Sequence, residues 1–256
     1  MLENLIIPSA LFVISGVLAL ILTPLVRALM TRLGAVDQPD ARRVNRVPIP
    51  RGGGLAVIVS FFATLTVAYC VWPTALLESP FYTLLPWFAS AAGILLITGL
   101  LDDLRGLPAL VKLLAQIVAA GLLCYGGARF LLPATWGAWT ASPWVYVPLT
   151  LAWYIGVINA FNLIDGLDGL SSGLAIIATA GLAGVLLVVS PGMILVVCPI
   201  LVGALLGFLR YNYHPATVFM GDTGSLFLGL TLGTLSLVTR REDAFVLTMG
   251  YVKVTE

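Results

Sequence analysis

The chain has 256 residues, of which 60% are hydrophobic and only 10% are charged, whereas about 25% charged residues are typical of a soluble domain. This composition excludes a soluble globular protein, a disordered chain and a fibrous repeat. The formal net charge of +1 leaves no basic surface for a phosphate backbone, so we exclude nucleic acid as a partner. The cysteines lie in apolar runs without metal-ligand spacing, so we expect neither a disulfide framework nor a zinc site.

The predicted elements are membrane-spanning helices, because about 20 apolar residues at 1.5 Å of rise per residue cross roughly 30 Å of hydrocarbon. We expect eight full spans and then a partial ninth that begins at Ala244. In chain order, the eight are 5–26, 55–77, 81–101, 109–125, 144–161, 171–189, 193–209 and 225–238. The sequence therefore predicts an all-α, polytopic helical bundle that forms a single integral membrane domain over residues 1–256.

The basic residues lie unevenly on the two sides of this arrangement. One side carries Arg27, Arg32, Arg42, Arg43, Arg46, Arg51, Arg105, Lys112 and Arg210, and the other carries Arg129, Arg240 and Arg241. Loops rich in Lys and Arg stay cytoplasmic. We therefore expect the N-terminus outside and the loops around 27–51, 102–112, 159–172 and 210–224 on the cytoplasmic face.

The first acidic motif is GLLDDLRGLPALVK, in which Asp102 and Asp103 close the third span and Lys112 begins the fourth. Two adjacent carboxylates both ionise at neutral pH only when a cation lies close to them. A divalent ion could supply that charge, and the absence of nearby Cys or His favours Mg²⁺ or Mn²⁺ over zinc. A solvated pair at a helix end beside Arg105 is the alternative that this motif leaves open.

Two further acidic motifs fall on the same predicted side. In NAFNLIDGLDGLSSG, the residues Asn159, Asn162, Asp165 and Asp168 recur at intervals of three and would share one stripe if the segment is helical. In FMGDTGSLFLG, Asp222 stands between glycines at the start of a span, where helix capping alone could explain an acid. Ionisable groups that recur at one membrane boundary are a functional-site hypothesis, so we expect these loops to converge.

The only long polar segment is LGAVDQPDARRVNRVPIPRGGG, at 33–54. Its arginines could bind phosphate oxygens, and the amides of glycines 52–54 at a helix start could add contacts to an anion. An ordinary positively charged cytoplasmic loop is the alternative. His214, the single histidine, is expected to be a plain loop residue.

Metal-binding acids beside basic groups on a cytoplasmic face suit phosphoryl chemistry, since a bound ion neutralises charge on a leaving group. The cytoplasm offers nucleotide-activated donors and the membrane offers a lipid acceptor. The pattern therefore predicts a group transfer between the two phases.

The strings GLLDDLRGLPALVKLLAQ, NAFNLIDGLDGL and VFMGDTGSLFLG, in this order, closely resemble the polyprenyl-phosphate N-acetylhexosamine-1-phosphate transferases of the MraY, WecA and TagO type over about residues 30–256. The resemblance implies a bacterial plasma-membrane enzyme that moves a sugar 1-phosphate from a UDP-sugar to undecaprenyl phosphate. UMP is released, and a cell-envelope polysaccharide is started. The 37–54 loop resembles the WecA-like branch, although Asn45 stands where that branch usually has His.

The resemblance also implies roles for individual residues. It implies Mg²⁺ ligands at Asp222 and Asn162, catalytic roles for Asp102, Asp103, Asp168 and Lys112, and substrate binding by Asn159, Asp165, Arg43, Asn45 and Arg51. Relatives continue into a histidine-rich loop and a tenth span, so we expect this chain to be truncated at its C-terminus. A homodimer is possible, because small-residue stripes can pair helices.

Two other classes of protein remain open from the sequence. A secondary transporter also has buried acids and glycine-broken helices, but its site lies near the bilayer midplane and its halves repeat. An intramembrane aspartyl protease could use Asp222, but it needs a second aspartate that follows a tyrosine within a span. No internal repeat and no Tyr-Asp pair is present in the sequence.

Overall fold

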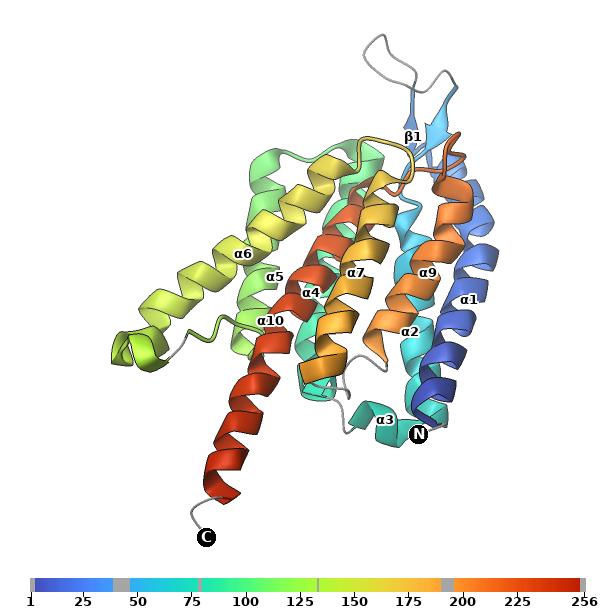
Figure 1. The fold of residues 1–256 in the computed structure, drawn as a ribbon. Coiled ribbons are helices and arrows are strands. Elements are labelled where there is room, and N and C mark those ends of the chain that lie inside the picture. Colours follow the sequence, from blue (N-terminus) through green and yellow to red (C-terminus); the bar gives the residue numbers. More distant parts are fainter. Residues whose placement is uncertain (1–2, 39–46, 78–79, 133, 190–195, 254–256) are drawn as a thin grey trace.

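The computed structural model describes residues 3–38, 47–77, 80–132, 134–189 and 196–253. These residues form a bundle of helices with one small two-stranded hairpin at its end (Figure 1). The helices are α1 Glu3–Leu33, α2 Gly54–Val71, α3 Pro73–Leu77, α4 Pro80–Arg105, α5 Ala109–Tyr125, α6 Pro143–Ile164, α7 Leu170–Val189, α9 Val197–Asn212 and α10 Gly221–Lys253. Short 3-10 helices cover Ala134–Trp136 and Ala138–Ala141, and strand β1 Val36–Asp37 pairs antiparallel with β2 Ile49–Pro50.

Four of the described helices are long and apolar enough to cross a membrane, and three further apolar helices are shorter. The long ones are Ile6–Leu33, Gly54–Val71, Phe81–Arg105 and Pro143–Ile164, and the shorter ones are Ala109–Tyr125, Leu170–Val185 and Val197–Asn212. The predicted all-α bundle and its membrane character are thus confirmed. The predicted number of spans, eight and a partial ninth, is not.

Two predicted boundaries are wrong. The segments 225–238 and 244–256 were expected as separate spans, but α10 runs unbroken from Gly221 to Lys253. The charged run at 240–243 lowers hydropathy without containing Gly or Pro, so nothing in it breaks a helix. The segment 55–77 was expected as one span, but it divides at Trp72, because Pro73 cannot continue the hydrogen-bond ladder of α2 and begins α3 instead.

Small residues allow α1 and α9 to pack closely against each other. A Cβ atom on Gly203 would lie 2.2 Å from the Phe12 carbonyl oxygen, and one on Gly207 would lie 2.4 Å from the Gly16 carbonyl oxygen. Without side chains at these positions the two backbones touch, which is the usual way that membrane helices associate. Gly203 and Gly207 therefore serve packing within the chain.

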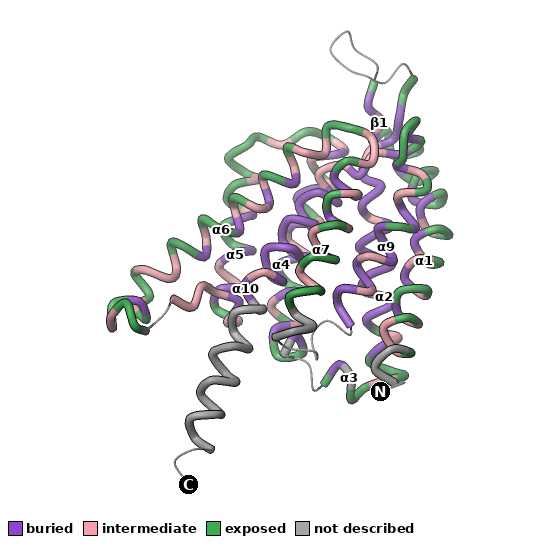
Figure 2. The backbone as a smooth tube through the Cα atoms, in the orientation of Figure 1, coloured by how far each residue is buried: buried purple, intermediate pink, exposed green. Residues whose placement is uncertain are grey.

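Aromatic side chains fill the core between α2, α4 and α10. Phe61, Phe88 and Phe227 are each fully buried, and their ring centroids lie 5.5–6.2 Å apart. Many residues of α1 and α6 are exposed, as Figure 2 shows. Large hydrophobic residues are common among them. Such a surface suits contact with lipid and not with water.

The ends of several helices meet at the end of the bundle that carries the β1–β2 hairpin (Figure 1). The C-terminal ends of α4, α6 and α9 and the N-terminal ends of α5, α7 and α10 lie there, whereas α1 begins at the opposite end. The loops that the sequence assigned to the cytoplasmic face are therefore gathered at one end of the molecule. This end holds the acidic motifs.

Candidate active site

The start of α10 is held by a carboxylate from α4. Asp103 is only 6% exposed, and its Oδ1 accepts the backbone N–H of Asp222 at 3.0 Å. Its Oδ2 accepts the backbone N–H of Thr223 at 3.0 Å and the Thr223 hydroxyl at 2.7 Å. Asp103 thus caps a helix of which it is not part, and its negative charge lies at the positive end of the helix dipole.

Gly221 permits this close approach. Its φ of +73° is disfavoured for residues with a side chain. A Cβ atom there would also lie 2.5 Å from Asp103 Oδ2 and 2.6 Å from the backbone nitrogen of Gly52. The glycine before Asp222 in the FMGDTG string is therefore required by both conformation and space, and it places the first turn of α10 directly against Asp103.

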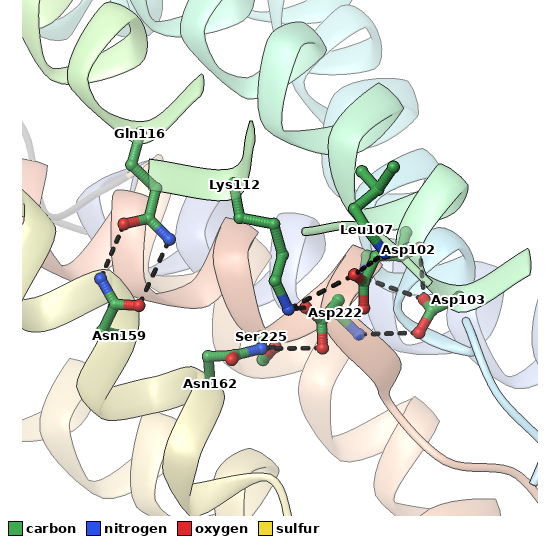
Figure 3. A network of polar contacts seen from close by, with 10 residues as sticks. Asp102, Asp103, Leu107, Lys112, Gln116, Asn159, Asn162, Asp222 and Ser225 are labelled. Carbon is green, nitrogen blue, oxygen red and sulfur yellow. Dashed lines mark hydrogen bonds and ion pairs between the residues drawn. The ribbon is translucent and has the colours of Figure 1, made fainter. Parts of the chain in front are cut away.

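Asp222, once positioned in this way, meets side chains from α5 and α6 (Figure 3). Lys112 Nζ lies 2.9 Å from Asp222 Oδ2 and 3.4 Å from Asp102 Oδ1. Asn162 Nδ2 donates to Asp222 Oδ1 at 2.9 Å and to Ser225 Oγ at 3.0 Å. Asp102 also accepts the backbone N–H of Leu107 at 2.8 Å. Four helices thus bring two carboxylates, one ammonium and one carboxamide together.

The two adjacent aspartates of the DD motif have different environments. Asp103 is buried and fully occupied by the start of α10, so it is not free to act as a base. Asp102 turns to Lys112 and keeps 13% of its side chain exposed. Asp103 therefore faces the backbone of α10, whereas Asp102 faces Lys112, whose ammonium supplies a positive charge of the kind that the sequence argument required.

The oxygen donors at this site suit a hard divalent cation. Asp102 and Asp222 offer carboxylate oxygens. A half-turn of the Asn162 side-chain amide would interchange its Nδ2 and Oδ1 atoms and direct a carbonyl oxygen toward the same space. Within the described part of the chain, no cluster of three or more His, Cys, Asp or Glu side chains is arranged to hold a metal. A metal here would thus need the amide and substrate oxygens as ligands.

A second polar pair lies deeper in the bundle, one helical turn from Lys112 and Asn162 (Figure 3). Asn159 Nδ2 donates to Gln116 Oε1 at 2.7 Å, and Gln116 Nε2 donates back at 3.4 Å. Gln116 is 2% exposed, and the sequence argument missed it. Its position four residues after Lys112 in an otherwise apolar helix was the available signal.

The acids of the DGLDG string do not continue the helical stripe that the sequence predicted. Helix α6 ends at Ile164, and Asp165 and Asp168 lie in the turn that follows. Asp165 accepts a hydrogen bond from Ser171, and burial raises the pKa of its carboxyl to about 7. Asp168 Oδ2 lies 2.8 Å from His214 Nδ1 and accepts the backbone N–H of Ala216 at 3.0 Å.

Comparisons with known proteins show the family to which the chain is related. The profile of glycosyl transferase family 4 matches residues 84–240. The chain is 39% identical to a probable undecaprenyl-phosphate N-acetylglucosaminyl 1-phosphate transferase of Bacillus subtilis, covering 89% of this chain and 62% of that protein. It is 36% identical to the decaprenyl-phosphate N-acetylglucosaminephosphotransferase of Mycolicibacterium smegmatis, covering 82% and 55%. It is 33% identical to the phospho-N-acetylmuramoyl-pentapeptide-transferase of Staphylococcus carnosus, covering 96% and 79%.

The chain belongs to the polyprenyl-phosphate hexosamine-1-phosphate transferase family. It spans 62% and 55% of the lengths of the Bacillus and Mycolicibacterium relatives. The matched range contains all of the polar groups from Asp102 to Asp222 that converge at the end of the bundle.

The arginine loop of this transferase-family chain lies outside the matched range. Arg51 pairs with the buried Asp37 through Nε and Oδ1, 2.9 Å apart, which ties the loop to the hairpin. The N–H groups of Gly53 and Gly54 donate to the carbonyl oxygens of Phe219 and Met220. The prediction that glycines 52–54 offer free amides to an anion is therefore wrong for these two. Arg43 and Asn45 lie outside the described residues.

Proposed function

We propose that this chain transfers an N-acetylhexosamine 1-phosphate from a UDP-sugar to undecaprenyl phosphate, releases UMP and starts a cell-envelope polysaccharide. The single observation that carries the proposal is the convergence of Lys112, Asp102 and Asp222 at one end of an apolar bundle. A water-soluble donor and a membrane-held acceptor can meet only at such an end. We place this end on the cytoplasmic face of the bacterial plasma membrane, where the basic loops belong.

Lys112 carries the electrostatic part of the proposed reaction. Its ammonium lies between two carboxylates and keeps 24% of its side chain exposed, so an incoming phosphate oxygen can reach it. Phosphoryl transfer depends mainly on positioning and on stabilising negative charge, and it needs little covalent chemistry from the protein. The carboxylates hold the ammonium in place until a phosphate takes over part of its hydrogen bonding.

Asp222 and Asn162 are the residues that would hold Mg²⁺, with Mn²⁺ as a substitute and with Asp102 within reach of the same space. When bound, the ion would neutralise charge on the pyrophosphate of the donor. Asp103 contributes by fixing the backbone of Asp222, so the orientation of that carboxylate does not depend on the ligand.

Direct attack by the lipid phosphate is the step that this geometry favours. Undecaprenyl phosphate already carries an oxyanion, so a covalent aspartyl intermediate would add a step without supplying a better nucleophile. Asp102 is the partly exposed carboxylate of the DD motif, and it is suited to keep the acceptor phosphate deprotonated. Asn159, Asp165, Asp168 and Arg51 then belong to the surroundings in which the donor and acceptor bind.

The test is an assay of the purified chain with radiolabelled UDP-N-acetylhexosamine, undecaprenyl phosphate and Mg²⁺, in which UMP and labelled lipid are measured. Wild type should form both products, Lys112→Met and Asp222→Asn should form neither, and Arg32→Gln should serve as a matched charge control at the same end. Full activity of Asp222→Asn would refute the metal assignment. Movement of solute across vesicles without labelled lipid would favour a transporter instead.

A further inference from the structure

A pocket separate from the active site lies between α1, α9 and the loop that follows α9. Its volume is about 440 Å³, which is within the range of roughly 300–1,000 Å³ typical of small-ligand sites. Arg27, Arg210, Tyr213, His214 and Thr217 are among the residues that line it. None of the groups that meet at Asp222 lines it, although His214 of the pocket contacts Asp168 of the DGLDG turn.

Two arginine side chains give this pocket its positive charge. Arg27 and Arg210 are both exposed, and within the described ranges neither guanidinium forms an ion pair. Among the described residues, the Asp168 carboxylate contacts the pocket through His214 Nδ1 and also accepts the Ala216 N–H. Both guanidinium groups belong to residues that line the same pocket, and arginine binds the oxygens of a phosphate group through paired hydrogen bonds.

A second, apolar groove adjoins the pocket on α9. Its volume is about 350 Å³, and Leu206 and Leu209 line it together with Arg210 and Tyr213, which it shares with the charged pocket. The two leucines precede Arg210 along α9, so the groove lies on the side of the pocket toward the middle of the bundle. A ligand that fills both spaces must be charged at one end and apolar at the other.

The rigidity of the site comes from the contact between its two helices. The Tyr211 hydroxyl donates to the Leu20 carbonyl oxygen of α1 at 3.1 Å, and glycine packing joins α1 and α9 nearby. The arginines are therefore held on one framework and not on independent loops. Their place near the ends of membrane-embedded helices is the depth at which lipid headgroups lie.

We infer that Arg27 and Arg210 bind the phosphate of an anionic phospholipid, whose acyl chain lies along Leu206 and Leu209. This site goes beyond the proposed transfer reaction and does not depend on it. His214 connects the two regions, because it lines the phospholipid pocket and is bonded to Asp168 of the DGLDG turn.

The inference can be tested by native mass spectrometry of the purified chain in detergent micelles. Dioleoyl phosphatidylglycerol and dioleoyl phosphatidylcholine have the same chains, so their comparison isolates the headgroup charge. Wild type should bind phosphatidylglycerol at least about tenfold more tightly, since hydrogen bonds to charged groups contribute on this scale. The double variant Arg27→Gln/Arg210→Gln should lose this preference, and Arg32→Gln, on the same helix outside the pocket, should keep it.

Three results would overturn the inference. Equal binding of both lipids by the wild-type protein would overturn it, and this measurement needs no variant to fold. Displacement of phosphatidylglycerol by millimolar inorganic phosphate would assign the pocket to a free anion. Displacement by equimolar undecaprenyl phosphate would assign it to the isoprenoid substrate. None of these measurements depends on transfer activity, so failure of the proposed function would leave the lipid assignment standing.

Discussion

Replacement of Asp103 by asparagine should destabilise the fold, whereas the same replacement of Asp102 should not. Asp103 is buried and accepts three hydrogen bonds from the first turn of α10, two from backbone N–H groups and one from the Thr223 hydroxyl. An asparagine keeps one carbonyl oxygen but turns an NH₂ group toward these donors. At least one buried donor then loses its acceptor, and the helix loses its negative cap.

The expected magnitude follows from these contacts. An unsatisfied buried donor costs roughly 1–3 kcal/mol, and a lost charge at a partly buried helix end costs up to ~2 kcal/mol. Asp103→Asn should therefore lower the free energy of unfolding by about 2–4 kcal/mol. At roughly 2–4 °C per kcal/mol for a chain of this size, the melting temperature should fall by ~4–16 °C. Asp102→Asn keeps the acceptor for Leu107 and loses a partly exposed ion pair, which costs at most about 1 kcal/mol.

The assay is thermal unfolding of both variants in the same detergent, combined with UMP release. Asp103→Asn should lose stability and activity together, because Asp222 is displaced. Asp102→Asn should lose activity while its melting temperature stays close to wild type. Equal melting temperatures for wild type and Asp103→Asn would refute the capping role, and a large loss of stability in Asp102→Asn would refute the division of the pair.

Three other predictions concern the surroundings of the site. Gly221→Ala should lower the free energy of unfolding by at least ~2 kcal/mol, because the added Cβ would meet the Asp103 carboxylate and the φ at this position is positive. An unchanged denaturation midpoint would contradict this. Gln116→Leu should cost about 1–3 kcal/mol, because the Asn159 side chain then loses both hydrogen bonds to Gln116 and keeps only the bond from its Nδ2 to the Ile155 carbonyl oxygen. The double variant with Asn159→Leu should recover most of this loss, and additive losses would argue against the pair. The pKa of Asp165 is about 7 in the folded state and 3.8 ordinarily, so the folded protein binds this proton more tightly than the unfolded chain does. Proton binding therefore stabilises the fold at low pH, and this stabilisation is lost as pH rises through 7. Asp165→Asn should therefore gain stability relative to wild type between pH 5 and pH 8, as thermal unfolding at both pH values would measure.

The amino-acid sequence determined the class of protein, and it indicated most of the polar residues that the structure brings together at one end of the bundle. Hydropathy alone indicated a membrane-embedded helical bundle, because long apolar runs have no other stable arrangement in lipid. Charge placement indicated that the acidic motifs lie at one end, and the structure gathers their helices there. Periodicity failed at Asp165, because an interval of three predicts a stripe only while the helix continues, and α6 ends one residue earlier.

What each polar residue does was decided only by the tertiary structure. Adjacent residues of a helix point in different directions, so Asp102 faces Lys112 while Asp103 faces the start of α10, and nothing in the letters DD tells the two apart. The amides of glycines 53 and 54 looked free in the sequence because their acceptors come from residues 219 and 220, far along the chain. Local pattern fixes which groups are available, but the packing of distant helices fixes which of them are already satisfied and which remain for a substrate.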